Sequence, residues 1–136
     1  MGKFKSLEDV RKFFEGDKLA ASLGMSIDEV SEGRCVVNCT IAETMHNGAG
    51  TLHGGLIFTL ADFAAAVAAN YYGVLSVTIN SSVSYYKAIS SGVVTAIATV
   101  NARTNRLCHL TVSIKNGEDE IAEFKSTFYV TGKEIA

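Results

Sequence analysis

The chain has 136 residues, of which 48% are hydrophobic and 19% charged, and its formal net charge is −2 at pH 7. This length predicts a single domain spanning residues 1–136, and the composition is typical of a globular protein with a sizeable core. The small negative charge, with no basic cluster, argues against nucleic acid as a partner. The three cysteines form no C-x-x-C pair. An odd number of cysteines favours a reduced, cytoplasmic protein over a secreted one held by disulfides.

The N-terminal segment predicts a short helix over residues 6–15, capped by Ser6 and apolar along one side. It lacks the continuous apolar run of a signal peptide, so we expect no secretion signal. Two strand-like stretches follow, at residues 24–30 and 34–43. The short sequence Ser-Glu-Gly between them predicts a hairpin turn.

A loop with four glycines, residues 46–55, leads into the longest apolar segment of the chain. This segment predicts a long helix that begins near Gly54 and ends at Tyr71–Gly73, where Gly73 suits the position after the helix. The helix approaches the length of a membrane span, but a carboxylate at its centre, Asp62, would be costly in lipid. We therefore expect a helix buried in a protein core, and no membrane partner.

Four strand-like segments follow the helix, at residues 74–89, 93–102, 107–115 and 120–132. Turn sequences separate them, so we expect the four to pair consecutively as an antiparallel meander. The long uncharged helix must bury most of its surface. A curved antiparallel sheet wrapped around one long central helix achieves this, and the predicted class is α+β.

Asp62 is isolated, because no other Asp, Glu, Lys or Arg lies between Glu43 and Lys87. A carboxylate on a buried helix needs hydrogen-bond partners or a raised pKa, and such acids are candidates for function. The glycines at the start of the same helix leave backbone N–H groups free to bind an anion or a carbonyl oxygen that gains charge. Gly54 and Asp62 are separated by about 12 Å along the helix axis. One carbonyl group cannot contact both, so we predict a symmetric dimer in which a second copy supplies the acid.

The loop and the first half of the helix carry a motif in the order Asn47-x-x-Gly50-x-x-His53-Gly54-Gly55 and Leu60-Ala61-Asp62. This motif resembles the PaaI-type, phenylacetyl-CoA thioesterase-like branch of the hotdog-fold acyl-CoA thioesterases. The order of the elements agrees with that family over essentially the whole chain. The resemblance implies a hotdog fold, homodimers that pair into homotetramers, and hydrolysis of an aryl- or medium-chain acyl-CoA to the free acid and CoA.

The resemblance also implies a role for each matching residue. The backbone N–H of Gly54 or Gly55 would polarise the thioester carbonyl, with Asn47 assisting. Asp62 of the second copy would act as general base or as nucleophile. His53 would shape the loop.

Two further sets of candidates rest on position within the family pattern. A hydroxyl on the strand after the helix would position the water; Thr78 stands nearest by spacing, and the alternatives are Ser76, Ser81 and Ser82. The candidates for binding the CoA phosphates are Lys87, Arg103 and Arg106.

Other functions fit the sequence less well. His46, His53 and Asp62 match no metal-ligand spacing, so we expect neither a metal nor a cofactor. The chain has no G-x-S-x-G elbow of a serine hydrolase, and the helix motif differs from that of hotdog dehydratases. The remaining alternative is a hotdog module that binds acyl-CoA without hydrolysing it, as a sensor or carrier-interacting protein. Asp62 and Asn47 argue against it, because binding alone needs no carboxylate beside a thioester.

Overall fold

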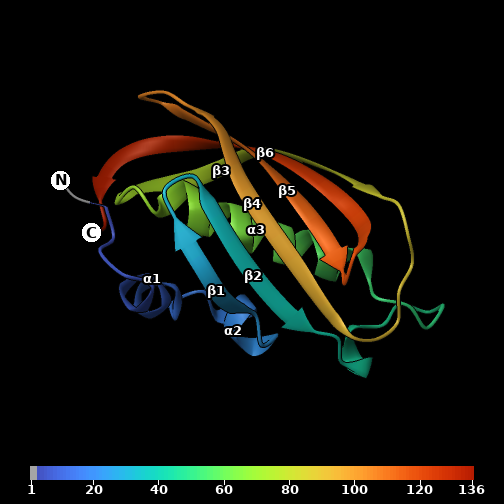
Figure 1. Cartoon of the computed structure of the whole chain (residues 1–136). Helices are drawn as coiled ribbons and strands as arrows, with labels where there is room; N and C mark the ends of the chain where they lie inside the picture. The colour runs from blue at the N-terminus through green and yellow to red at the C-terminus, as the bar shows by residue number, and fades with distance from the viewer. Residues whose placement is uncertain (1–2) are drawn as a thin grey trace.

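The computed structural model describes residues 3–136 and contains one antiparallel sheet curved around a central helix (Figure 1). The elements in chain order are α1 (Leu7–Phe14), α2 (Lys18–Ser22), β1 (Ser26–Ser31), β2 (Arg34–Thr40), η1 (Glu43–Met45), α3 (Gly54–Asn70), β3 (Val74–Tyr85), β4 (Val93–Arg103), β5 (Leu107–Asn116) and β6 (Asp119–Glu134). Helix α3 contacts all six strands, and its alanines let them approach closely. The predicted α+β hotdog architecture is confirmed.

The strand order is β1-β2-β4-β5-β6-β3, and it corrects the expected meander. β4, β5 and β6 do pair consecutively, but β3 pairs with β6 and not with β4. The hairpin of β1 and β2 occupies the edge of β4 that β3 would need. β3 therefore lies at the far edge of the sheet, and one of its own edges has no neighbouring strand among residues 3–136.

The turn from α3 to β3 is organised by a buried asparagine. Asn70 Nδ2 donates to the carbonyls of Ala66 and Ser76, at 2.8 and 3.1 Å, and its Oδ1 accepts from Ser76 N at 2.8 Å. Gly73 has a φ of 84°, a conformation that favours glycine, so its predicted place just after the helix is confirmed. β3 consequently starts at the C-terminal end of α3 and runs back along it.

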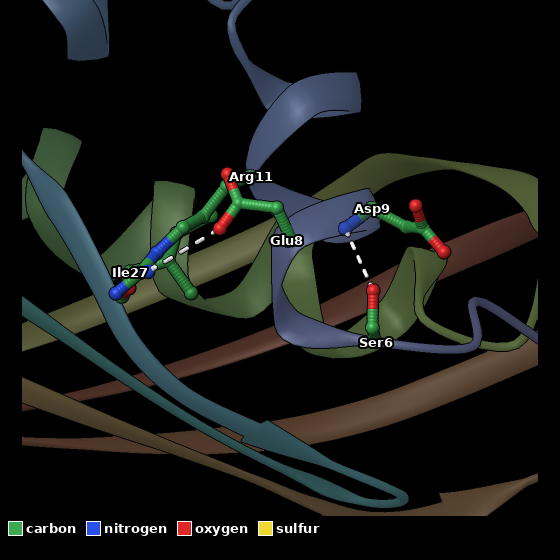
Figure 2. A network of polar contacts seen from close by, with 5 residues as sticks. All are labelled: Ser6, Glu8, Asp9, Arg11 and Ile27. Atoms are coloured by element: carbon green, nitrogen blue, oxygen red, sulfur yellow. Dashed lines mark hydrogen bonds and ion pairs between the residues drawn. The ribbon is translucent and has the colours of Figure 1, made fainter.

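The N-terminal helix packs beside β1 (Figure 2). Ser6 caps α1 as predicted, since its Oγ accepts from Asp9 N at 3.1 Å. Arg11 reaches across to β1, where its Nε donates to the carbonyl of Ile27 at 2.9 Å. The accompanying Arg11–Glu8 ion pair, at 3.9 Å, is exposed and contributes little. The hydrogen bond from the Arg11 side chain to the Ile27 carbonyl is thus the polar contact that joins α1 to the sheet in Figure 2.

Helix α2 was absent from the sequence expectation. It is only five residues long, and it is capped by Asp17, whose Oδ1 accepts from Ala20 N at 3.1 Å. No apolar periodicity can identify so short a helix. It packs against α3 and so brings Asp17 near the middle of the central helix.

All three cysteines are buried free thiols. Burial raises the pKa of Cys35 to about 12, which keeps this thiol protonated at neutral pH. Burial also raises the pKa of Cys39 and of Cys108. The cysteines therefore pack as small hydrophobic side chains. None of the helices described is both long and apolar enough to cross a membrane.

Candidate active site

The glycine-rich loop before α3 is held by its own asparagine. Asn47 Oδ1 accepts from the backbone N–H groups of Ala49 and Thr51, at 3.0 and 3.1 Å, and its Nδ2 donates to Thr51 Oγ1 at 3.0 Å. Gly50 lies within this turn with a φ of 77°. The Asn47 side chain is therefore engaged in ordering the loop, and it lines the same pocket as Gly54.

The connection between β3 and β4 braces this loop from outside. Leu52 N donates to the carbonyl of Ile89 at 2.7 Å, and His46 Nε2 lies 2.8 Å from the carbonyl oxygen of Ser90. Residues 86–92 thus cross the entrance of α3 on their way to β4. The corrected strand order explains this contact, because β5 and β6 lie between β4 and β3 in the sheet and the connection must cross that distance.

The first turn of α3 distinguishes between the two candidate glycines. His53 caps the helix, and its Nδ1 accepts from Gly55 N at 2.8 Å. The carbonyl of His53 accepts from Leu56 N at 2.9 Å. Gly54 N–H has no hydrogen-bond partner among residues 3–136. Of the two amides, only the one of Gly54 is without a hydrogen bond in residues 3–136, and the His53 side chain caps the helix start.

One side of α3 is not covered by the sheet. This open face of α3 consists of residues at helical spacing that are exposed or half-buried: Gly55, Phe58, Thr59, Asp62 and Ala66. Asp62 lies in its centre, and Thr78 Oγ1 of β3 donates to Asp62 Oδ1 at 3.2 Å. Of the four hydroxyl candidates on β3, only Thr78 has a hydrogen bond to Asp62 within the part of the chain described.

The surroundings of Asp62 disfavour its charged form. Burial raises the pKa of this carboxyl, the hydrogen bond from Thr78 partly opposes that shift, and the nearby Asp17 carboxylate raises the pKa further. A carboxyl with a raised pKa is a stronger base than an ordinary aspartate once it is ionised. This is the property that general-base catalysis near neutral pH needs.

Comparison with known proteins identifies the family. The thioesterase superfamily model matches residues 49–123, which include His53, Gly54, Asp62 and Thr78. A protein of Archaeoglobus fulgidus that carries a provisional esterase name is 34% identical, over 93% of this chain and 84% of its own. The chain belongs to the thioesterase superfamily.

Two further comparisons place this thioesterase-superfamily chain close to PaaI. The acyl-coenzyme A thioesterase PaaI of Escherichia coli is 38% identical over 54% of this chain and 52% of its own. The solved structure of the E. coli PaaI protein matches with a TM-score of 0.88, at 29% identity and over 92% of both chains. The expectation of a PaaI-type hotdog thioesterase is confirmed.

The three basic residues predicted as candidates for binding CoA do not lie together. Lys87 lines a pocket of about 290 Å³ beside Gly54, and its Nζ pairs with Asp119 at 2.6 Å. Arg103 stacks over the ring of Tyr72, just beyond the C-terminal end of α3, with 4.2 Å from Cζ to the ring centroid. Arg106 donates to the Tyr129 hydroxyl at 3.0 Å. Only Lys87 is placed near the start of the helix.

The two histidines that sequence analysis weighed and rejected as metal ligands make other contacts. His46 is engaged with the Ser90 carbonyl and His53 with the Gly55 amide. Residues 3–136 contain no group of three or more histidine, cysteine or acidic side chains arranged to hold a metal ion.

Two interactions at the site are not predicted by the sequence. Asp17 approaches Asp62 from α2, and Tyr85 donates from its hydroxyl to the carbonyl of Gly54 at 2.9 Å. No local pattern signals either contact, because both join segments far apart in the chain.

Proposed function

We propose that the protein hydrolyses acyl-CoA thioesters, with aryl- or medium-chain acyl groups as substrates. The observation that carries the proposal is the half-buried Asp62, held by Thr78 on the open face of α3. Membership of the thioesterase superfamily supports the reaction class. The aryl class is supported by the similarity to the E. coli PaaI protein, which is described as coming from the phenylacetic acid degradation operon.

In the proposed reaction the Gly54 N–H binds the thioester carbonyl oxygen and stabilises the charge that develops on it. Asp62 takes a proton from water while the water oxygen bonds to the carbonyl carbon. The carbon–sulfur bond then breaks, CoA leaves as the thiolate and is reprotonated, and the acid is released. In the nucleophilic variant, Asp62 attacks the carbonyl carbon itself, and the carbon–sulfur bond breaks as CoA leaves as the thiolate and is reprotonated. Water then cleaves the resulting anhydride, which releases the acid and restores Asp62.

We propose that the amide and the acid come from two copies of the chain. On one helix they lie about 12 Å apart along the axis, too far for one carbonyl group to contact both. The open face of α3 and the neighbouring edge strand β3, with Val77 and Ile79 exposed at 44% and 58%, offer a surface for a second copy. Long edge strands with apolar side chains are prone to pair with another chain. A homodimer, paired into a tetramer as in the family pattern, is the expected assembly.

The alternative is an acyl-CoA-binding module without activity. Release of free thiol from a panel of aryl, short-, medium- and long-chain acyl-CoAs separates the two functions. We expect turnover of aryl or medium-chain substrates. Binding of acyl-CoA in a calorimeter, without thiol release from any member of the panel, would instead establish the binding module.

The pH dependence of kcat/KM tests the environment of Asp62. Because burial and Asp17 raise its pKa, activity should fall on acidification at a higher pH than the ordinary aspartate value of 3.8 predicts. Asp17→Asn removes the repelling charge, so the acidic limb should move to lower pH. Activity at neutral pH should stay nearly unchanged. A limb that is unaffected by Asp17→Asn would show that the charge of Asp17 does not act on the group being titrated.

A further inference from the structure

Tyr85, the last residue of β3, clamps the first residue of α3. Its hydroxyl donates to the carbonyl oxygen of Gly54 at 2.9 Å. Its ring also covers the Cα of Gly54, since a Cβ built there would lie 3.2 Å from Tyr85 Cζ and 3.3 Å from Oη. One side chain thus contacts Gly54 both through a hydrogen bond and through van der Waals packing.

The clamp acts on the residue whose conformation matters most for the proposed chemistry. Glycine is the most flexible residue, and the first turn of a helix is held by fewer hydrogen bonds than its interior. A hydrogen bond to the Gly54 carbonyl restricts the backbone of this residue. The Gly54 N–H lies in the preceding peptide unit, which joins the held carbonyl through the φ and ψ torsions of Gly54. Limiting these torsions limits the direction of the N–H, and directed donors are what oxyanion stabilisation needs.

We propose that Tyr85 is a positioning residue that holds the Gly54 N–H in the direction of the thioester carbonyl. The inference rests on the proposed function. It gives β3 two roles, because Thr78 in the first half of the strand orders the acid and Tyr85 at its last position orders the amide. If a second copy completes the site, these supports serve two different half-sites.

Tyr85→Phe is the first test, because it keeps the ring and removes only the hydroxyl. We expect kcat to fall about 3- to 10-fold, as for the loss of one neutral hydrogen bond that acts in the transition state, with KM unchanged. Tyr71→Phe, at the opposite end of α3, is the matched control and should behave as wild type. Equal kcat in Tyr85→Phe and wild type would overturn the proposal.

A double-mutant cycle tests the packing half of the clamp. Gly54→Ala keeps the N–H but pushes the new Cβ against the Tyr85 ring, so kcat should fall about tenfold. In a Tyr85→Leu background the neighbouring ring is gone, and the same substitution should lower kcat less than about twofold. Additive effects would show that Tyr85 and Gly54 act independently and would contradict the inference.

Amide hydrogen exchange of the protein without substrate separates this inference from the proposed function. Tyr85→Phe should shift the Gly54 and Gly55 amide resonances and speed exchange of the Gly55 amide, which is hydrogen-bonded to His53, while Tyr71→Phe should do neither. If the wild type hydrolyses no acyl-CoA, the proposed function fails, and the exchange data still decide whether Tyr85 orders Gly54. Unchanged Gly54 and Gly55 signals in Tyr85→Phe would overturn the clamp itself.

Discussion

Replacing Asp62 by asparagine is expected to lower kcat about 10³-fold while KM changes little. Asparagine has nearly the same shape and can still accept the hydrogen bond from Thr78, but it cannot take a proton from water or attack a carbonyl. Thiol release under saturating acyl-CoA measures kcat. Calorimetry with a non-hydrolysable acyl-CoA thioether measures whether the variant still binds its ligand, and so whether the site is intact.

The control for this variant is Asp17→Asn, a change from acid to amide in the neighbouring helix. It should retain nearly full activity at neutral pH, because Asp17 affects the charge of Asp62 without serving the reaction. If Asp62→Asn keeps more than about a tenth of wild-type kcat, a role as general base or nucleophile is ruled out.

Asp62→Asn should also stabilise the fold at neutral pH. The folded-state pKa of Asp62 is raised, so the stability associated with its protonated form is present in acid and is lost as pH rises through that pKa. Asparagine has no such loss. The Tm of Asp62→Asn should therefore exceed that of wild type at neutral pH, and the difference should shrink in acid. Such an inverse relation between stability and activity is common at functional sites.

Gly54→Pro should lower kcat about 10²- to 10³-fold relative to Gly54→Ala, because proline removes the N–H that binds the carbonyl oxygen. The first position of a helix accepts proline readily. His53, with φ −62° and ψ 132°, has the extended backbone preferred before proline. The substitution is thus compatible with the backbone on both sides.

The alanine variant is the matched control, because it introduces a Cβ at the same place but keeps the donor. Comparing the two variants separates the lost hydrogen bond from the contact with Tyr85. Circular dichroism and Tm confirm that both fold. Equal kcat values for the proline and alanine variants would mean that the Gly54 N–H does not take part in the reaction.

Local sequence patterns predicted much of the fold. The Ser6 cap, the Gly73 helix end and the hairpins of β1–β2, β4–β5 and β5–β6 follow from turn and capping residues, and the structure confirms them. The isolation of Asp62 in an uncharged segment indicated a functional residue in the middle of α3. In the structure, Thr78 donates a hydrogen bond to this carboxyl. The caps and hairpins depend on residues close together in the chain, and Asp62 stands out because it is the one charged residue in an uncharged segment.

Long-range pairing could not be predicted in the same way. The sequence between β3 and β4 resembles an ordinary turn, but β2 and β5 occupy both edges of β4, and β3 lies beside β6 at the far edge of the sheet. The choice between Gly54 and Gly55 depends on the His53 ring, and the Tyr85 clamp depends on β3 returning along α3. Such contacts arise from tertiary packing rather than from local propensity.

Mixed dimers test the central claim that two copies share each site. Dimers with one Asp62→Asn chain and one Gly54→Pro chain can be isolated through two different affinity tags. In the proposed arrangement one of the two sites combines an intact Gly54 with an intact Asp62 from the other chain, while the second site carries both substitutions. Each such dimer should recover about half of the wild-type kcat, although both parent proteins are nearly inactive.

The reciprocal pairing, wild type with a chain carrying both substitutions, should be nearly inactive, because every site then lacks one group. Measured side by side, these two mixed dimers decide the question. Activity in the first and not in the second is the predicted result. Activity only in the second would place Gly54 and Asp62 of a single chain in one site and would contradict the shared active site.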